Sequence, residues 1–82
     1  MTSLEELRTQ LSDVDDQITD LYEKRMKICE DLGTCKIKNG HKTFDRQREK
    51  NKIAEVMGKV SSDFNKKGIG EVYELLLAIS RK

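Results

Sequence analysis

Proline is absent from this 82-residue sequence, as is tryptophan, and histidine occurs once. Without proline, no residue forces a kink or a stop inside a helix. The two cysteines, Cys29 and Cys35, lie six positions apart, so on one helix they point about 120° away from each other and cannot bridge. Without a Cys-x-x-Cys pair, the chain also offers too few ligands for a zinc site. We therefore expect reduced cysteines and no zinc site, in a cytoplasmic protein.

Long apolar runs are also lacking. No stretch reaches the length of a membrane span, and the amino-terminal MTSLEEL is acidic where a secretory signal would be basic and then apolar. We therefore expect no membrane partner and no signal peptide.

Charge is abundant but unevenly placed. Charged residues make up 38% of the chain, for a net charge of +1. Residues 1–23 carry seven acids against one base, Arg8, whereas residues 36–52 carry seven bases against Asp45 and Glu49. The basic run is compatible with a helical dimer that binds nucleic acid. Such a site would need aromatic residues among its basic ones, and this run contains only Phe44, so we expect no nucleic-acid partner.

Apolar residues step by three and four along the first part of the chain, which predicts one long helix from Leu4 to about Ile37. Thr2 or Ser3 can cap it, and Gly33 is expected to lie inside it. Arg25 occupies a position on the apolar stripe where a leucine would fit. The stripe consists of Leu4, Leu7, Leu11, Val14, Ile18, Leu21, Arg25, Ile28, Leu32 and Cys35.

Two shorter helices are predicted after a polar turn at Asn39-Gly40. Asp45 is the expected N-cap of the second, whose apolar face is Ile53, Val56, Met57 and Val60. Residues 61–70 have turn composition and predict a loop. The third helix is expected from about Glu71, with Val72, Leu75, Leu76 and Ile79 facing inward. The fold class is thus all-α, with one long and two short helices in a single domain, 1–82.

The long helix predicts a partner. From Leu4 to Cys35, at about 1.5 Å per residue, it is about 48 Å long, whereas a compact chain of this size is about 30 Å across. Its apolar stripe needs another surface, and the opposite charges of the two halves favour an intertwined antiparallel homodimer. Such pairing sets Arg8 of the partner subunit between Arg25 and Lys36, so that three cations from two chains surround one pocket.

Three inward cations need anions, either from the fold or from a ligand. A small dicarboxylate carrying a hydroxyl suits this set, with arginines for its carboxylates, lysine for a third oxygen and Glu49 for the hydroxyl. Each residue also has a plainer interpretation. Arg25 can form an ion pair with Asp20 or Glu23. Asp45 can be a helix cap with no further role, and the other residues can be solvated surface groups.

The order and spacing of several pieces resemble the all-helical chorismate mutases over Leu4 to Lys82. The pieces are LRTQLSDVDDQITDLYEKR, Gly33 with Lys36, the NG turn, FDRQREK and the carboxy-terminal AIS. The resemblance implies an intertwined dimer that converts chorismate to prephenate by a Claisen rearrangement without metal or cofactor.

The resemblance also implies roles for individual residues. The residues that correspond to catalytic ones are Lys36, Arg25 and Glu49. In the family, the matching lysine lies beside the breaking ether bond, and the matching glutamate holds the substrate hydroxyl. The substrate-binding set would be Arg8 of the partner subunit together with Arg25, Lys36, Asp45, Arg48, Glu49 and Ser80.

One position departs from the family pattern. The family usually carries Gln or Glu one turn after the matching serine, which would be position 84, and this sequence stops at Lys82. We therefore expect a shortened chain or a domain of a larger, bifunctional aromatic-pathway enzyme, in which binding persists better than turnover. Two alternatives stay open: a regulatory module of the same fold that senses chorismate or prephenate, and a lyase that acts on isochorismate.

Overall fold

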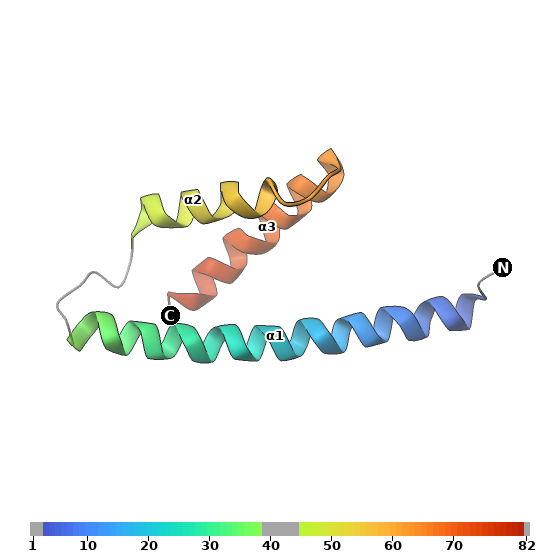
Figure 1. Ribbon diagram of the computed structural model, residues 1–82, viewed down its shortest axis with the longest axis horizontal. Helices are drawn as coiled ribbons and strands as arrows, with labels where there is room; N and C mark the ends of the chain where they lie inside the picture. The colour runs from blue at the N-terminus through green and yellow to red at the C-terminus, as the bar shows by residue number, and fades with distance from the viewer. Residues whose placement is uncertain (1–2, 39–44, 82) are drawn as a thin grey trace. The chain divides into compact units, whose positions relative to one another are not determined.

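Three helices make up the part of the chain that the computed structural model describes, residues 3–38 and 45–81 (Figure 1). They are α1 (Leu4–Lys38), α2 (Arg46–Met57) and α3 (Asp63–Ser80), and no strand occurs among these residues. The predicted all-α class with three helices is confirmed. The predicted turn at Asn39-Gly40 lies outside the described residues, as does the side chain of Lys36.

Helix α1 spans 35 residues and follows the predicted bounds to within one residue. Ser3 caps it, because its Oγ accepts a hydrogen bond of 3.1 Å from the Glu6 backbone N–H. Glu5 and Glu6 occupy the first turn, where acids suit the helix dipole. Gly33 lies inside the helix as predicted, since the periodic residues on both sides outweigh its weak helical preference.

The chain divides into two compact units, residues 1–32 and residues 33–82, each of which is described by itself. In the first unit the large apolar side chains of the α1 stripe are exposed, with Leu4 and Ile28 each at 64%. Large apolar side chains in such a continuous row are typical of a surface that another chain or element covers. The exposed members in this unit are Leu4, Leu7, Leu11, Val14, Ile18, Leu21, Ile28 and Leu32.

Helix α2 begins where the sequence predicts. Asp45 has extended backbone angles and its Oδ1 accepts from the Arg48 backbone N–H at 3.1 Å, which makes it the N-cap. The helix ends at Met57, and the N–H of Gly58 closes the last turn by donating to the Ala54 carbonyl. Val60 therefore lies beyond α2, and its assignment to the apolar face of that helix is wrong.

Helix α3 begins eight residues earlier than predicted. The Oγ of Ser62 accepts from the Asn65 backbone N–H at 3.0 Å, and Asp63 lies in the first turn. Residues 63–70 are therefore helical, and the prediction of a loop over 61–70 is wrong. The two glycines of this stretch lower its helix propensity, but the cap and the packing of Gly70 compensate.

Helices α2 and α3 pack against each other at a close contact between Gly70 and Met57. Gly70 is buried, and a Cβ at that position would lie 3.2 Å from the Met57 Sδ. Leu77 is the other buried residue of α3. Val72 and Leu75 were predicted to face inward, but they are 57% and 64% exposed, because the single short helix α2 covers only one side of α3.

Candidate functional site: a charged groove between α2 and α3

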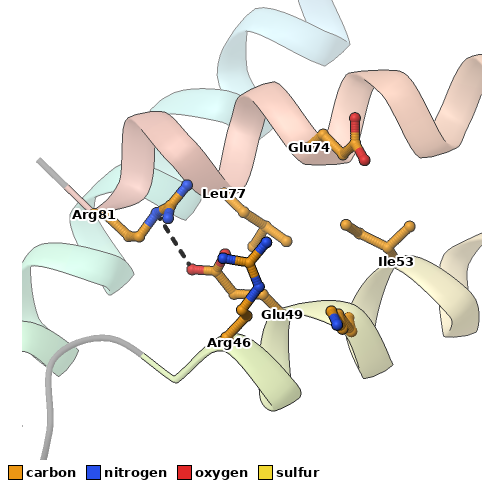
Figure 2. Close-up of a pocket in the computed structure, with 7 residues that line it drawn as sticks. Arg46, Glu49, Ile53, Glu74, Leu77 and Arg81 are labelled. Carbon is orange, nitrogen blue, oxygen red and sulfur yellow. Dashed lines mark ion pairs between the residues drawn. The ribbon is translucent and has the colours of Figure 1, made fainter.

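A groove of about 280 Å³ lies between α2 and α3, wholly within the second unit (Figure 2). Apolar side chains from each helix and charged side chains from both form its walls. Its lining residues are Arg46, Glu49, Lys50, Ile53, Glu74, Leu77 and Arg81.

An ion pair crosses this groove. The Nε of Arg81, the C-cap residue of α3, lies 3.5 Å from the Oε2 of Glu49 in the first turn of α2. The Glu49 side chain is 22% exposed and the Arg81 side chain 39% exposed, so water screens the pair only in part. Figure 2 shows the two side chains reaching toward each other from their separate helices.

The charge of the groove favours an anionic guest. Its lining contains three cations, Arg46, Lys50 and Arg81, against two carboxylates, Glu49 and Glu74. Arginine donates in a planar fork that fits carboxylates, and a partly enclosed wall strengthens such contacts relative to open water. The net positive charge of the lining therefore favours a small anion over a cation.

The three predicted site residues at the start of α2, Asp45, Arg48 and Glu49, have different environments in the structure. Glu49 lines the groove, whereas Arg48 is exposed and is not among the lining residues. Asp45 caps the helix through the Arg48 backbone N–H, which matches its plainer interpretation.

Ser80 lies in the last turn of α3 and is half-buried. Its hydroxyl donates to the Leu76 carbonyl at 2.7 Å, which is a common bond for serine inside a helix. The predicted binding role of Ser80 stays a prediction.

The remaining predicted residues, Arg8, Arg25 and Lys36, all lie on α1. Arg8 is exposed. Arg25 is half-buried, and its Nη1 donates to the Cys29 Sγ at 3.5 Å. Seventeen residues of straight helix hold Arg8 and Arg25 about 25 Å apart within one chain, so a single copy does not bring them to one small ligand.

Sequence reasoning missed five groove residues: Arg46, Lys50, Glu74, Leu77 and Arg81. On α2 a signal was present, because Arg46, Glu49, Lys50 and Ile53 recur at helical spacing and thus share one face. On α3 the same spacing was present, because Glu74, Leu77 and Arg81 also recur at steps of three and four, but the prediction chose a different face of that helix as the inward one.

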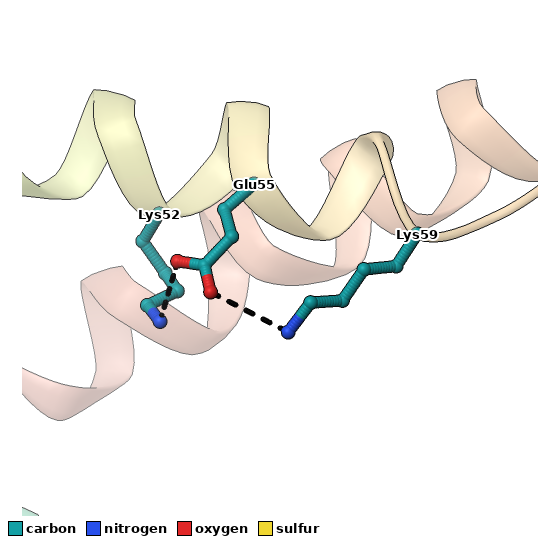
Figure 3. Close-up of polar contacts among 3 residues, drawn as sticks. All are labelled: Lys52, Glu55 and Lys59. Atoms are coloured by element: carbon teal, nitrogen blue, oxygen red, sulfur yellow. Dashed lines mark hydrogen bonds and ion pairs between the residues drawn. The ribbon is translucent and has the colours of Figure 1, made fainter.

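An exposed charge cluster is formed by two residues of α2 and one residue just after it, none of which lines the groove (Figure 3). Lys52 lies 2.9 Å and Lys59 3.4 Å from the Glu55 carboxylate oxygens. Their hydrogen bonds, followed by their charges, hold the pKa of Glu55 below its usual value of 4.5. All three side chains are substantially exposed, so this cluster is a solvated surface feature.

No three His, Cys, Asp or Glu side chains come together as a metal-binding group within 3–38 and 45–81. Across the same residues, none of the helices combines the length and the apolar character needed to cross a membrane.

The fold and the groove define an all-helical domain with a small, charged, ligand-sized site. In a comparison with protein families, the family model described as chorismate mutase type II matches residues 7–82 of this chain. The chain belongs to the chorismate mutase type II family, as the sequence resemblance predicted. Neither the comparison with curated proteins nor the comparison with solved structures produced a match.

Proposed function

We propose that this protein is a chorismate mutase, an isomerase that rearranges chorismate to prephenate in phenylalanine and tyrosine biosynthesis. The observation that carries the proposal is the family match over residues 7–82, because that range contains every predicted site residue from Arg8 to Ser80. The anion-favouring groove beside Glu49 supports it, since chorismate carries two carboxylates and a hydroxyl.

The rearrangement of chorismate needs only substrate binding and electrostatic stabilisation from the protein. In the Claisen rearrangement the ether C–O bond breaks while a C–C bond forms in the same molecule, so no atom is gained or lost. No nucleophile, general acid or general base is needed. The protein contributes by holding the flexible substrate in a compact chair and by placing positive charge where the ether oxygen gains electron density.

The residue roles follow from the charge each side chain carries. Lys36 and Arg25 supply positive charge at the ether oxygen and at a carboxylate, and Glu49 accepts a hydrogen bond from the substrate hydroxyl. Arg48 and Arg8 of the partner subunit bind the carboxylates. Asp45 orders the start of α2, and Ser80 is a further polar contact.

The site is proposed to be complete only in an antiparallel homodimer. The exposed apolar row of α1 supports this, because pairing two such helices removes it from water. Arg8 and Arg25 of one chain are about 25 Å apart, and the same pairing overcomes this separation because it brings Arg8 of the partner subunit between Arg25 and Lys36.

The test is the loss of chorismate absorbance, with wild type compared with Lys36→Ala. We expect the substitution to lower kcat by at least about 10²-fold, the usual effect of removing one group that stabilises developing negative charge. Lys27→Ala is the matched control, because Lys27 lies on the same helix and pairs only at the surface, 3.3 Å from Asp31. It should change the rate by less than about twofold.

Other outcomes would point elsewhere. Tight chorismate binding without turnover would indicate the sensing module, and release of pyruvate from isochorismate would indicate the lyase. Turnover that survives Lys36→Ala at the wild-type rate would refute the proposed role of that lysine.

A further inference from the structure

The ion pair between Arg81 of α3 and Glu49 of α2 is not explained by the residue roles proposed above. It joins Glu49, which the proposed mechanism uses for the substrate hydroxyl, to Arg81, which no proposed role includes. We propose that Arg81 is a positioning residue: its guanidinium holds the Glu49 carboxylate in the orientation that receives the hydroxyl. This inference rests on the proposed function.

The geometry leaves room for both partners of Glu49. The Arg81 Nε approaches Oε2 at 3.5 Å, and Oε1 has no hydrogen bond or ion pair with any described residue. A carboxylate can accept hydrogen bonds at both oxygens, so the substrate hydroxyl can bind Oε1 while Arg81 keeps Oε2. The ion pair thus fixes the orientation of the Glu49 carboxylate and leaves Oε1 available to accept the hydrogen bond from the substrate hydroxyl.

Positioning matters here because a glutamate side chain rotates freely at three bonds. When such a side chain binds a ligand, the lost rotamer freedom weakens the binding. An ion pair formed before the ligand arrives removes part of that loss. The low exposure of Glu49, 22%, and its neighbours Ile53 and Leu77 in the groove wall limit competition from water.

Arg81 is itself held in place from two directions. Its backbone N–H donates to the carbonyls of Leu77 and Ile79, which makes it the C-cap of α3. Its positive charge also suits the negative end of the helix dipole. A purely structural role is therefore the competing explanation, in which the pair ties α2 to α3 and has no effect on the substrate.

Kinetics of the full chain with chorismate separate the two explanations. The proteins are wild type, R81Q, R81K, E49Q and the double variant R81Q/E49Q, each measured per folded molecule after circular dichroism. K67Q is the matched control, because it removes an exposed cation from the same helix outside the groove.

Positioning predicts that R81Q lowers kcat/KM about fivefold, the upper range for a partly exposed ion pair, and that R81K restores most of it. R81Q should then cause no further loss on the E49Q background, because the group that it positions is gone. K67Q should leave the rate unchanged.

Two results would overturn the inference while leaving the mutase proposal intact: wild-type kcat/KM in R81Q, or the same fold loss with and without Glu49. If wild type neither turns over chorismate nor binds it in calorimetry, the proposed function fails and the positioning role fails with it.

Discussion

The close approach of α3 to Met57 of α2 allows a quantitative prediction at Gly70. A methyl group there would lie 3.2 Å from the Met57 Sδ, 3.6 Å from its Cγ and 3.7 Å from its Cε. Carbon contacts are optimal at about 3.5–4.0 Å, so the first distance is too short by a few tenths of an ångström. Gly70→Ala therefore combines a gain in helix propensity of about 1 kcal/mol with a packing penalty.

Met57 decides the size of that penalty. Its side chain is flexible and half-buried at the end of α2, so it can move aside for one methyl group. We expect Gly70→Ala to change the free energy of unfolding by less than about 0.5 kcal/mol, as the two effects nearly cancel. Gly70→Leu adds three more carbons to the same contact and should destabilise by about 1–3 kcal/mol.

Gly68 provides the control, because nothing lies within 4 Å of a Cβ at that position in the same helix. Gly68→Ala should gain the full propensity of about 1 kcal/mol. For a chain of this length, that gain corresponds to a rise in Tm of about 4–8 °C. Urea and thermal unfolding at one fixed protein concentration would measure all three variants, since any dimer makes Tm concentration-dependent. If Gly70→Leu were as stable as wild type, the described α2–α3 contact would be wrong.

Three other predictions concern the helix cap, an ion pair and the dimer. Ser62→Ala should lower the free energy of unfolding by about 1 kcal/mol in urea, because the Asn65 N–H loses its acceptor. The pKa of Glu55, followed by NMR, should lie below 4.5 in the folded chain and rise on Lys52→Gln. Ile18→Asp should shift sedimentation from twice the chain mass to the monomer mass, because it puts a charge in the middle of the exposed apolar stripe of α1.

The effect of the Glu55 ion pairs depends on pH, and the other two substitutions have matched controls. A depressed carboxyl pKa stabilises the folded state above the unfolded pKa, and that contribution is lost as pH falls through the folded pKa, so acid should remove it. Ser62→Asp should retain the cap, and Gln17→Asp, beside the stripe, should leave the dimer intact. A wild-type chain that sediments as a monomer would exclude Arg8 of a second copy from the site.

Local chemistry in the sequence was enough to predict the class of the fold, both ends of α1 and the start of α2. The three-and-four spacing from Leu4 to Leu32 predicts α1, and Asp45 predicts the start of α2, because periodicity and capping act within one or two turns of chain. The start of α3 was missed because SSDFNKKGIG has the composition of a turn, while the Ser62 cap and the buried contact at Gly70 hold it in a helix.

The groove was decided by tertiary structure. Glu49 could be singled out from its motif, but its partner Arg81 could not, because an ion pair between two helices depends on which faces meet. That choice rests on the contact between Gly70 and Met57, where the missing side chain lets α2 and α3 approach each other. The sequence by itself determined the helices and the residues available for chemistry, whereas packing determined which of their charges face one another.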